Sequence, residues 1–105
     1  MSDIAFKARG NGETIVFLHG VGGGAESWDA QLAAFGATHR AIAWDMPGYG
    51  ASPALPEPGF EAWAAALLSL LDGMGVERCV LVGHSIGGMI AQTFMKIHAH
   101  RVSRL

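Results

Sequence analysis

The stretch "RCVLVGHSIGGMIAQ", residues 78–92, contains an abrupt change from one kind of secondary structure to another. Its first residues form an apolar run that is typical of a buried strand, and this run ends at Gly83. From Ile86 onward, apolar residues recur at helical spacing as far as Ile97. Ser85 therefore lies in a tight turn between a strand and a helix, where a serine usually has a chemical role.

The rest of the chain repeats this alternation of strands and helices. Strands are predicted at residues 4–9, 14–18, 41–44 and 78–82, and helices at 28–35, 60–74 and 86–97. Such alternation predicts an α/β fold, with a mostly parallel sheet and helices on both faces. There is no internal repeat or linker, so we expect residues 1–105 to belong to a single domain.

Composition narrows the class of protein. Half of the 105 residues are hydrophobic and 15% are charged, which predicts a folded core rather than disorder. The net charge of −2 gives no reason to expect a nucleic acid or an anionic membrane as partner. No apolar run approaches the roughly 18 residues of a membrane span, and the N-terminus has no apolar core of signal-peptide length. We therefore expect a cytoplasmic protein.

Few side chains suggest redox or metal chemistry. Cys79 is the only cysteine, so no internal disulfide can form, and we expect it to be a buried, inert thiol. The histidines at positions 39, 98 and 100 follow no metal-ligand spacing, so no metal site is predicted.

The residues from Gly83 to Gly87 match the pattern G-x-S-x-G of a nucleophile elbow. Glycines are needed in this pattern because side chains beside the strained serine would collide. The turn pushes the hydroxyl of Ser85 out above the sheet. It also leaves the backbone N–H of Ile86 free at a helix N-terminus, where it could stabilise an oxyanion.

Three segments together resemble the N-terminal part of an α/β-hydrolase. They are "FLHGVGGGAESW" (17–28), "AWDMPGYGAS" (43–52) and "LVGHSIGGMIAQ" (81–92), and they occur in the family's order and at its usual separations. The similarity is greatest to small esterases and lactonases, such as enol-lactonases. Serine at position 85 argues against the branches of the family that place an aspartate there, the haloalkane dehalogenases and epoxide hydrolases.

This resemblance implies a serine hydrolase that acts on an ester or lactone through an acyl-enzyme, with Ser85 as nucleophile. The backbone N–H groups of Val21 and Ile86 would form the oxyanion hole. The resemblance implies no metal and no organic cofactor. Support for the elbow and the oxyanion loop would come from five residues: His19, Gly20, Gly83, His84 and Gly87.

The general base is missing from the expected place. In this family the acid and the histidine follow the serine, but no carboxylate follows Ser85 in this chain. His98 and His100 lie roughly 20 Å along the predicted helix, and His19 on the oxyanion loop is the nearest candidate in the chain. We therefore expect the acid and the histidine to lie outside these residues, because an intact domain has roughly 250 residues. The chain alone would then be a very weak enzyme.

Two other functions remain open. As a truncated fragment, the chain could act by binding or by self-association, because strand 78–82 would keep an open edge where a further strand should pair. Residues 20–25 also fit the dinucleotide fingerprint G-x-G-x-x-G/A, with Asp45 near the position of a ribose-binding acid. Against this second alternative, His19 separates the strand from the glycines, and the fingerprint leaves the turn at Ser85 unexplained. We expect Asp45 to anchor its own loop through backbone N–H groups.

Overall fold

The computed structural model describes residues 3–105, which form one sheet covered by helices. The sheet has five strands in the order β1-β3-β2-β4-β5; β1 runs antiparallel to β3, and all other neighbours are parallel. The strands are β1 (Phe6–Arg9), β2 (Thr14–Leu18), β3 (Arg40–Trp44), β4 (Cys79–Gly83) and β5 (Val102–Arg104). The sheet confirms the predicted α/β class.

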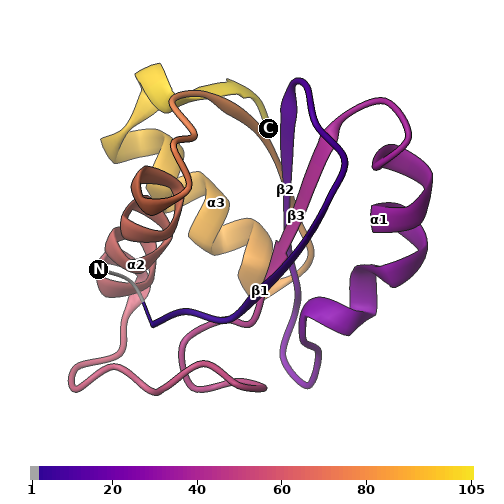
Figure 1. Ribbon diagram of the computed structural model, residues 1–105. Coiled ribbons are helices and arrows are strands. Elements are labelled where there is room, and N and C mark those ends of the chain that lie inside the picture. The colour runs from indigo at the N-terminus through magenta and orange to yellow at the C-terminus, as the bar shows by residue number, and fades with distance from the viewer. Residues whose placement is uncertain (1–2) are drawn as a thin grey trace.

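The helices lie on both faces of this sheet, with α1 on one side and α2 and α3 on the other (Figure 1). They are α1 (Asp29–Phe35), α2 (Phe60–Gly73) and α3 (Ile86–Ile97), with short 3₁₀ helices η1 (Ala25–Trp28) and η2 (Ala99–Arg101). The predicted helix over 28–35 is thus a 3₁₀ turn followed by α1, and it ends at Gly36 as expected. No helix among residues 3–105 is long and apolar enough to cross a membrane.

Strand periodicity divides the core between the two faces of the sheet. On β3, Ile42 and Trp44 point into the larger cluster beneath α2 and α3, whereas Ala41 and Ala43 point into the smaller cluster beneath α1. All five residues of β2 are buried, which explains why its sequence is apolar without alternation. The alanines leave room for α1 to pack close to β3.

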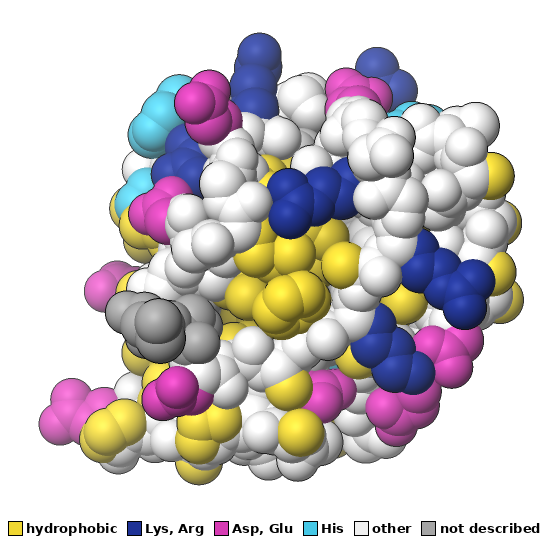
Figure 2. Space-filling view, viewed as in Figure 1, with side chains coloured by type: hydrophobic (Ala, Val, Ile, Leu, Met, Phe, Trp, Pro, Cys, Tyr) yellow, Lys and Arg dark blue, Asp and Glu magenta, His cyan; other side chains and the backbone are white. Residues whose placement is uncertain are grey.

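The β1 edge of the sheet is less completely covered. Phe6 pairs with Trp44 and points to the same face of the sheet, yet Phe6 is 44% exposed. Figure 2, viewed from the side of β1, shows apolar side chains gathered in the middle of this face, bordered by basic and acidic side chains. Lys7 lies on the opposite face of β1, and its ammonium group binds Asp29 of α1 at 3.0 Å.

The sequence predicts an open edge along strand 78–82, and this prediction is wrong for the start of the strand. β5 lies parallel to β4 there, with Cys79 opposite Val102 and Val80 opposite Arg104. Periodicity could not reveal β5 because it has three residues, of which one, Val102, is buried. The open edge is therefore limited to the end of β4.

Hydrogen bonds of Arg101, the residue before β5, hold this strand against the sheet. Its guanidinium donates hydrogen bonds to the carbonyl oxygens of Val76 and Glu77 and to the carboxylate of Asp72, the last at 2.7 Å. The Arg101 side chain is 16% exposed. These contacts lie on the last turn of α2 and on the segment between α2 and β4, so they hold a very short strand in place through the residue before it.

Three parallel strands end side by side at one edge of the sheet. In register, Leu18 of β2 lies opposite Gly83 of β4, and Phe17 lies opposite Ala43 of β3. The loops that follow β2, β3 and β4 therefore meet at the carboxyl ends of the strands, which is where α/β sheets usually place their binding sites.

Candidate functional site

Ser85 is held in a strained backbone conformation at the turn from β4 to α3. Its φ is +57° and its ψ −120°, and within residues 3–105 it is the one non-glycine residue with positive φ. A Cβ atom on Gly87 would lie 2.2 Å from the carbonyl oxygen of Leu18, and one on Gly83 would lie 2.5 Å from the Cα of Gly88. Glycine is required at both positions because backbone occupies the space.

The first turn of α3 leaves a donor at its N-terminus. The amide N–H of Gly88 donates to the carbonyl oxygen of Ser85 at 2.9 Å, and the amide of Gly87 donates to that of His84 at 3.0 Å. The N–H of Ile86 has no acceptor within residues 3–105. An unpaired N–H at the positive end of a helix is suited to stabilise negative charge.

The loop after β2 brings a second donor beside the elbow. A tight turn is closed by the N–H of Gly23 and the carbonyl oxygen of Gly20 at 3.0 Å, with Gly22 at φ +81°. The N–H of Val21, inside this turn, has no acceptor among residues 3–105. A Cβ on Gly20 would lie 2.8 Å from Nδ1 of His84, so the loop lies directly against the elbow.

His19 fixes the base of this loop. Its side chain is 1% exposed; Nε2 accepts the N–H of Met46 at 3.0 Å, and Nδ1 lies 2.8 Å from the carbonyl oxygen of Gly20. Nδ1 must donate in this contact, which makes the imidazole neutral. Tyr49 packs edge-on against the ring at 5.4 Å. Since both ring nitrogens are engaged, His19 is not available as a base for Ser85.

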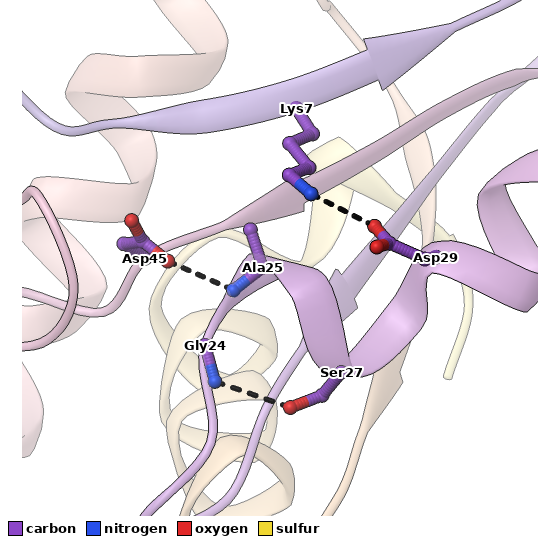
Figure 3. A network of polar contacts seen from close by, with 6 residues as sticks. All are labelled: Lys7, Gly24, Ala25, Ser27, Asp29 and Asp45. Carbon is purple, nitrogen blue, oxygen red and sulfur yellow. Dashed lines mark hydrogen bonds and ion pairs between the residues drawn. The ribbon is translucent and has the colours of Figure 1, made fainter.

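Asp45 joins the loop after β3 to the loop after β2. Its Oδ2 accepts the N–H of Ala51 at 3.0 Å, which confirms that Asp45 anchors its own loop. Its Oδ1 accepts the N–H of Ala25 at 2.8 Å, a contact that the sequence did not reveal (Figure 3). The residue is 9% exposed, so its carboxylate is not placed to hold a ribose, and the dinucleotide alternative loses its acid.

Two serines complete the support of these loops. The hydroxyl of Ser27 accepts the N–H of Gly24 at 3.2 Å at the start of η1 (Figure 3). Ser52 is buried; its hydroxyl donates to the carbonyl oxygen of Asp45 and accepts the N–H of Ala5 at 2.8 Å. Sequence reasoning missed both because serine is an ordinary residue in glycine-rich loops.

The remaining histidines are not gathered near Ser85. The rings of His98 and His100 lie 6.5 Å apart beyond the far end of α3, and His39 lies 3.8 Å from the carboxylate of Glu13. Among residues 3–105, no three His, Cys, Asp or Glu side chains are grouped so that they could hold a metal ion. The site consists of Ser85, two unpaired amides and the side chains that position them.

Comparisons with known proteins identify the family to which this fold belongs. A family model described as the alpha/beta hydrolase fold matches residues 13–105. RutD of Variovorax paradoxus, a carbamate hydrolase by name, is 37% identical over 98 residues, which are 90% of this chain and 37% of RutD.

Solved structures give the same result. An esterase from Thermogutta terrifontis superposes with a TM-score of 0.90 at 31% identity, covering 94% of this chain and 37% of that protein. Est816, described as an N-acyl homoserine lactone degrading enzyme, superposes with a TM-score of 0.91 at 35% identity, covering 94% of this chain and 39% of Est816. Proteins named as epoxide hydrolases match as well. The chain thus spans about two fifths of the length of RutD, the esterase and Est816.

Proposed function

This chain belongs to the α/β-hydrolase family, and we propose that Ser85 is the nucleophile of a hydrolase that acts on a carboxylic ester or lactone. One observation carries the proposal. Ser85 has a positive φ at a strand-to-helix turn, and the backbone N–H of the next residue, Ile86, has no acceptor among residues 3–105. The names of the esterase and of Est816 support an ester or lactone as the substrate class.

In the proposed reaction, the Ser85 hydroxyl attacks the carbonyl carbon and loses its proton to a base. The amides of Val21 and Ile86 donate to the oxygen that becomes negatively charged in the tetrahedral intermediate. The alcohol or ring oxygen then leaves, and water hydrolyses the acyl-enzyme by the same steps. His19 keeps its role of fixing the oxyanion loop, since neither of its nitrogens is available for proton transfer.

The base and its acid would come from outside residues 3–105, in the part of the family's length that this chain does not span. Without a base, a serine triad loses on the order of 10⁶ in kcat, and the oxyanion hole and binding retain about 10³ to 10⁴ over the uncatalysed reaction. The 105-residue chain would therefore hydrolyse esters very slowly by itself.

A fluorophosphonate probe and an added base test this proposal together. We expect slow labelling of Ser85 and slow hydrolysis of p-nitrophenyl esters, both accelerated by imidazole because imidazole supplies the missing base. Ser85→Ala should abolish labelling and remove the hydrolysis that exceeds the rate with imidazole alone, whereas Ser103→Ala, which changes an exposed serine of β5, should leave both as they are. Imidazole-dependent hydrolysis that is equal in Ser85→Ala and the unmodified chain would refute Ser85 as the nucleophile.

The alternative is a chain that acts by association rather than catalysis. Residues 81–83 of β4 have no strand partner on the β5 side within the described residues, so a short sheet edge remains available to a second copy. Sedimentation velocity over a range of concentrations tests this alternative. A monomer at all concentrations would exclude it, and a dimer that forms as the concentration rises would support it.

A further inference from the structure

A cavity of about 340 Å³ lies beside the predicted oxyanion hole. One wall is His19 and the loop Gly20–Gly23, another is formed by Ser27 and Trp28 of η1 and Gln31 of α1, and His84 of the elbow closes a third side. Its volume is within the range of small-molecule sites. Ser85 does not line the cavity, so a group in this space would sit next to the reacting carbonyl rather than at it.

The lining of the cavity is polar. No Lys, Arg, Asp or Glu side chain lines the cavity. The carboxamide of Gln31 makes no hydrogen bond within residues 3–105, so its donor and its acceptor are both available to a ligand. The hydroxyl of Ser27 accepts one bond from Gly24 and keeps its own proton. The exposed imidazole of His84 adds a further polar group.

A group that both donates and accepts hydrogen bonds without carrying charge is the natural complement of such a lining. A carboxylate would find no Lys or Arg side chain here to offset the cost of its desolvation. An alkyl chain would leave the Gln31 carboxamide without a partner. A neutral amide satisfies both sides of that carboxamide, and the indole of Trp28 and the side chain of Val21 offer apolar surface to the atoms around it.

We propose that this cavity is a subsite for an amide group carried by the ester or lactone substrate, with Gln31 as its specificity-determining residue. The inference rests on the proposed function, because the cavity borders both Val21 and the residue before Ser85. It goes further in naming the chemical class of the substrate: an ester or lactone with an uncharged amide within a few bonds of its carbonyl.

Two substrates of equal length test the subsite. p-Nitrophenyl 4-acetamidobutanoate carries an amide where p-nitrophenyl heptanoate carries two methylenes, and both can be assayed with imidazole present. Gln31→Leu should lower kcat/KM for the amide ester relative to the heptanoate by about tenfold, mainly through KM, since tenfold corresponds to about 1.4 kcal/mol, which is within the net contribution of one or two hydrogen bonds. Gln92→Leu, an exposed glutamine of α3, is the matched control and should leave this ratio unaltered.

A binding measurement separates failure of the subsite from failure of the proposed function. In an NMR titration with N-acetylglycinamide, the side-chain amide signal of Gln31 should shift and saturate, and that of Gln92 should not. This readout needs no catalysis. If Gln31 does not respond, or if Gln31→Leu leaves the substrate ratio at its original value, the subsite is refuted even if Ser85 is active. Saturable shifts without any Ser85-dependent hydrolysis would support the subsite and refute the proposed function.

Discussion

Replacing Asp45 with asparagine should destabilise the fold far more than the same change at Asp29. Both aspartates lie in the network of Figure 3, but their surroundings differ. Asp45 is 9% exposed, and its two oxygens accept the amides of Ala25 and Ala51 at 2.8 and 3.0 Å. Asp29 pairs with Lys7 at the surface, where 60% of the Asp29 side chain is exposed.

The expected magnitude follows from these contacts. Asparagine keeps one acceptor oxygen, so Asp45→Asn loses one charge-assisted hydrogen bond, worth about 1.5–3 kcal/mol. The new NH₂ group also faces a backbone N–H that then has no acceptor. We expect the free energy of unfolding to fall by about 2–4 kcal/mol, a large fraction of the ~5–15 kcal/mol typical of a domain. Asp29→Asn breaks an exposed ion pair, and such pairs contribute less than about 1 kcal/mol.

Urea unfolding followed by tryptophan fluorescence measures both variants. The midpoint should move clearly for Asp45→Asn and little for Asp29→Asn, with similar slopes. Labelling of Ser85 by a fluorophosphonate, measured without urea, should also slow in Asp45→Asn because Ala25 ends the loop that carries the Val21 amide. Equal stabilities of the two variants would show that the Asp45 contacts do not hold the loops together.

Three further outcomes are expected. Gly87→Ala should prevent folding or lower the midpoint of thermal unfolding strongly, because the new Cβ would lie 2.2 Å from the Leu18 carbonyl oxygen; Gly59→Ala, which meets nothing within 4 Å, is the control. Arg101→Leu should speed amide hydrogen exchange in β5, since Arg101 loses its bonds to two carbonyl oxygens and a carboxylate; unchanged exchange would show that β5 needs no such anchor. Burial raises the pKa of Cys79 from 9.0 to about 11, so the folded state holds the proton more tightly than the unfolded state. The effect of Cys79 on stability should therefore be absent below pH 9 and destabilising between pH 9 and 11, and Ellman's reagent at pH 8 should react with this thiol only after unfolding in urea.

The parts of the fold that the sequence predicts are those whose signal is local. The apolar run at β2, the helical spacing of α3 and the glycine after α1 each depend on neighbouring residues alone, and the structure has all three. β5 escaped prediction because its position depends on Arg101, whose partners lie 24 to 29 residues earlier in the chain. A three-residue strand held by a distant anchor leaves no periodic pattern.

The same distinction applies to the site. The elbow could be read from five consecutive residues, because its glycines and its serine serve one turn. The role of His19 could not be read in this way, since its partner Met46 is 27 residues away. From the sequence alone, a histidine on this loop could equally be a general base. The sequence does not indicate a functional role for Gln31, because polar residues are common on the exposed face of an amphipathic helix.

The strain at Ser85 links these observations. A non-glycine residue at positive φ costs about 1–3 kcal/mol and persists only where its surroundings determine it. Here the N–H of His84 donates to the Leu18 carbonyl oxygen at 3.0 Å, and Gly87 lies against that same oxygen, so the end of β2 holds both sides of the turn. The contacts that fix the serine and the predicted oxyanion hole are thus all made within the described residues. The side chains for proton transfer in the proposed reaction are not among them. Added imidazole should therefore raise the rate of hydrolysis without any change of structure, and a rise that required refolding would contradict this separation.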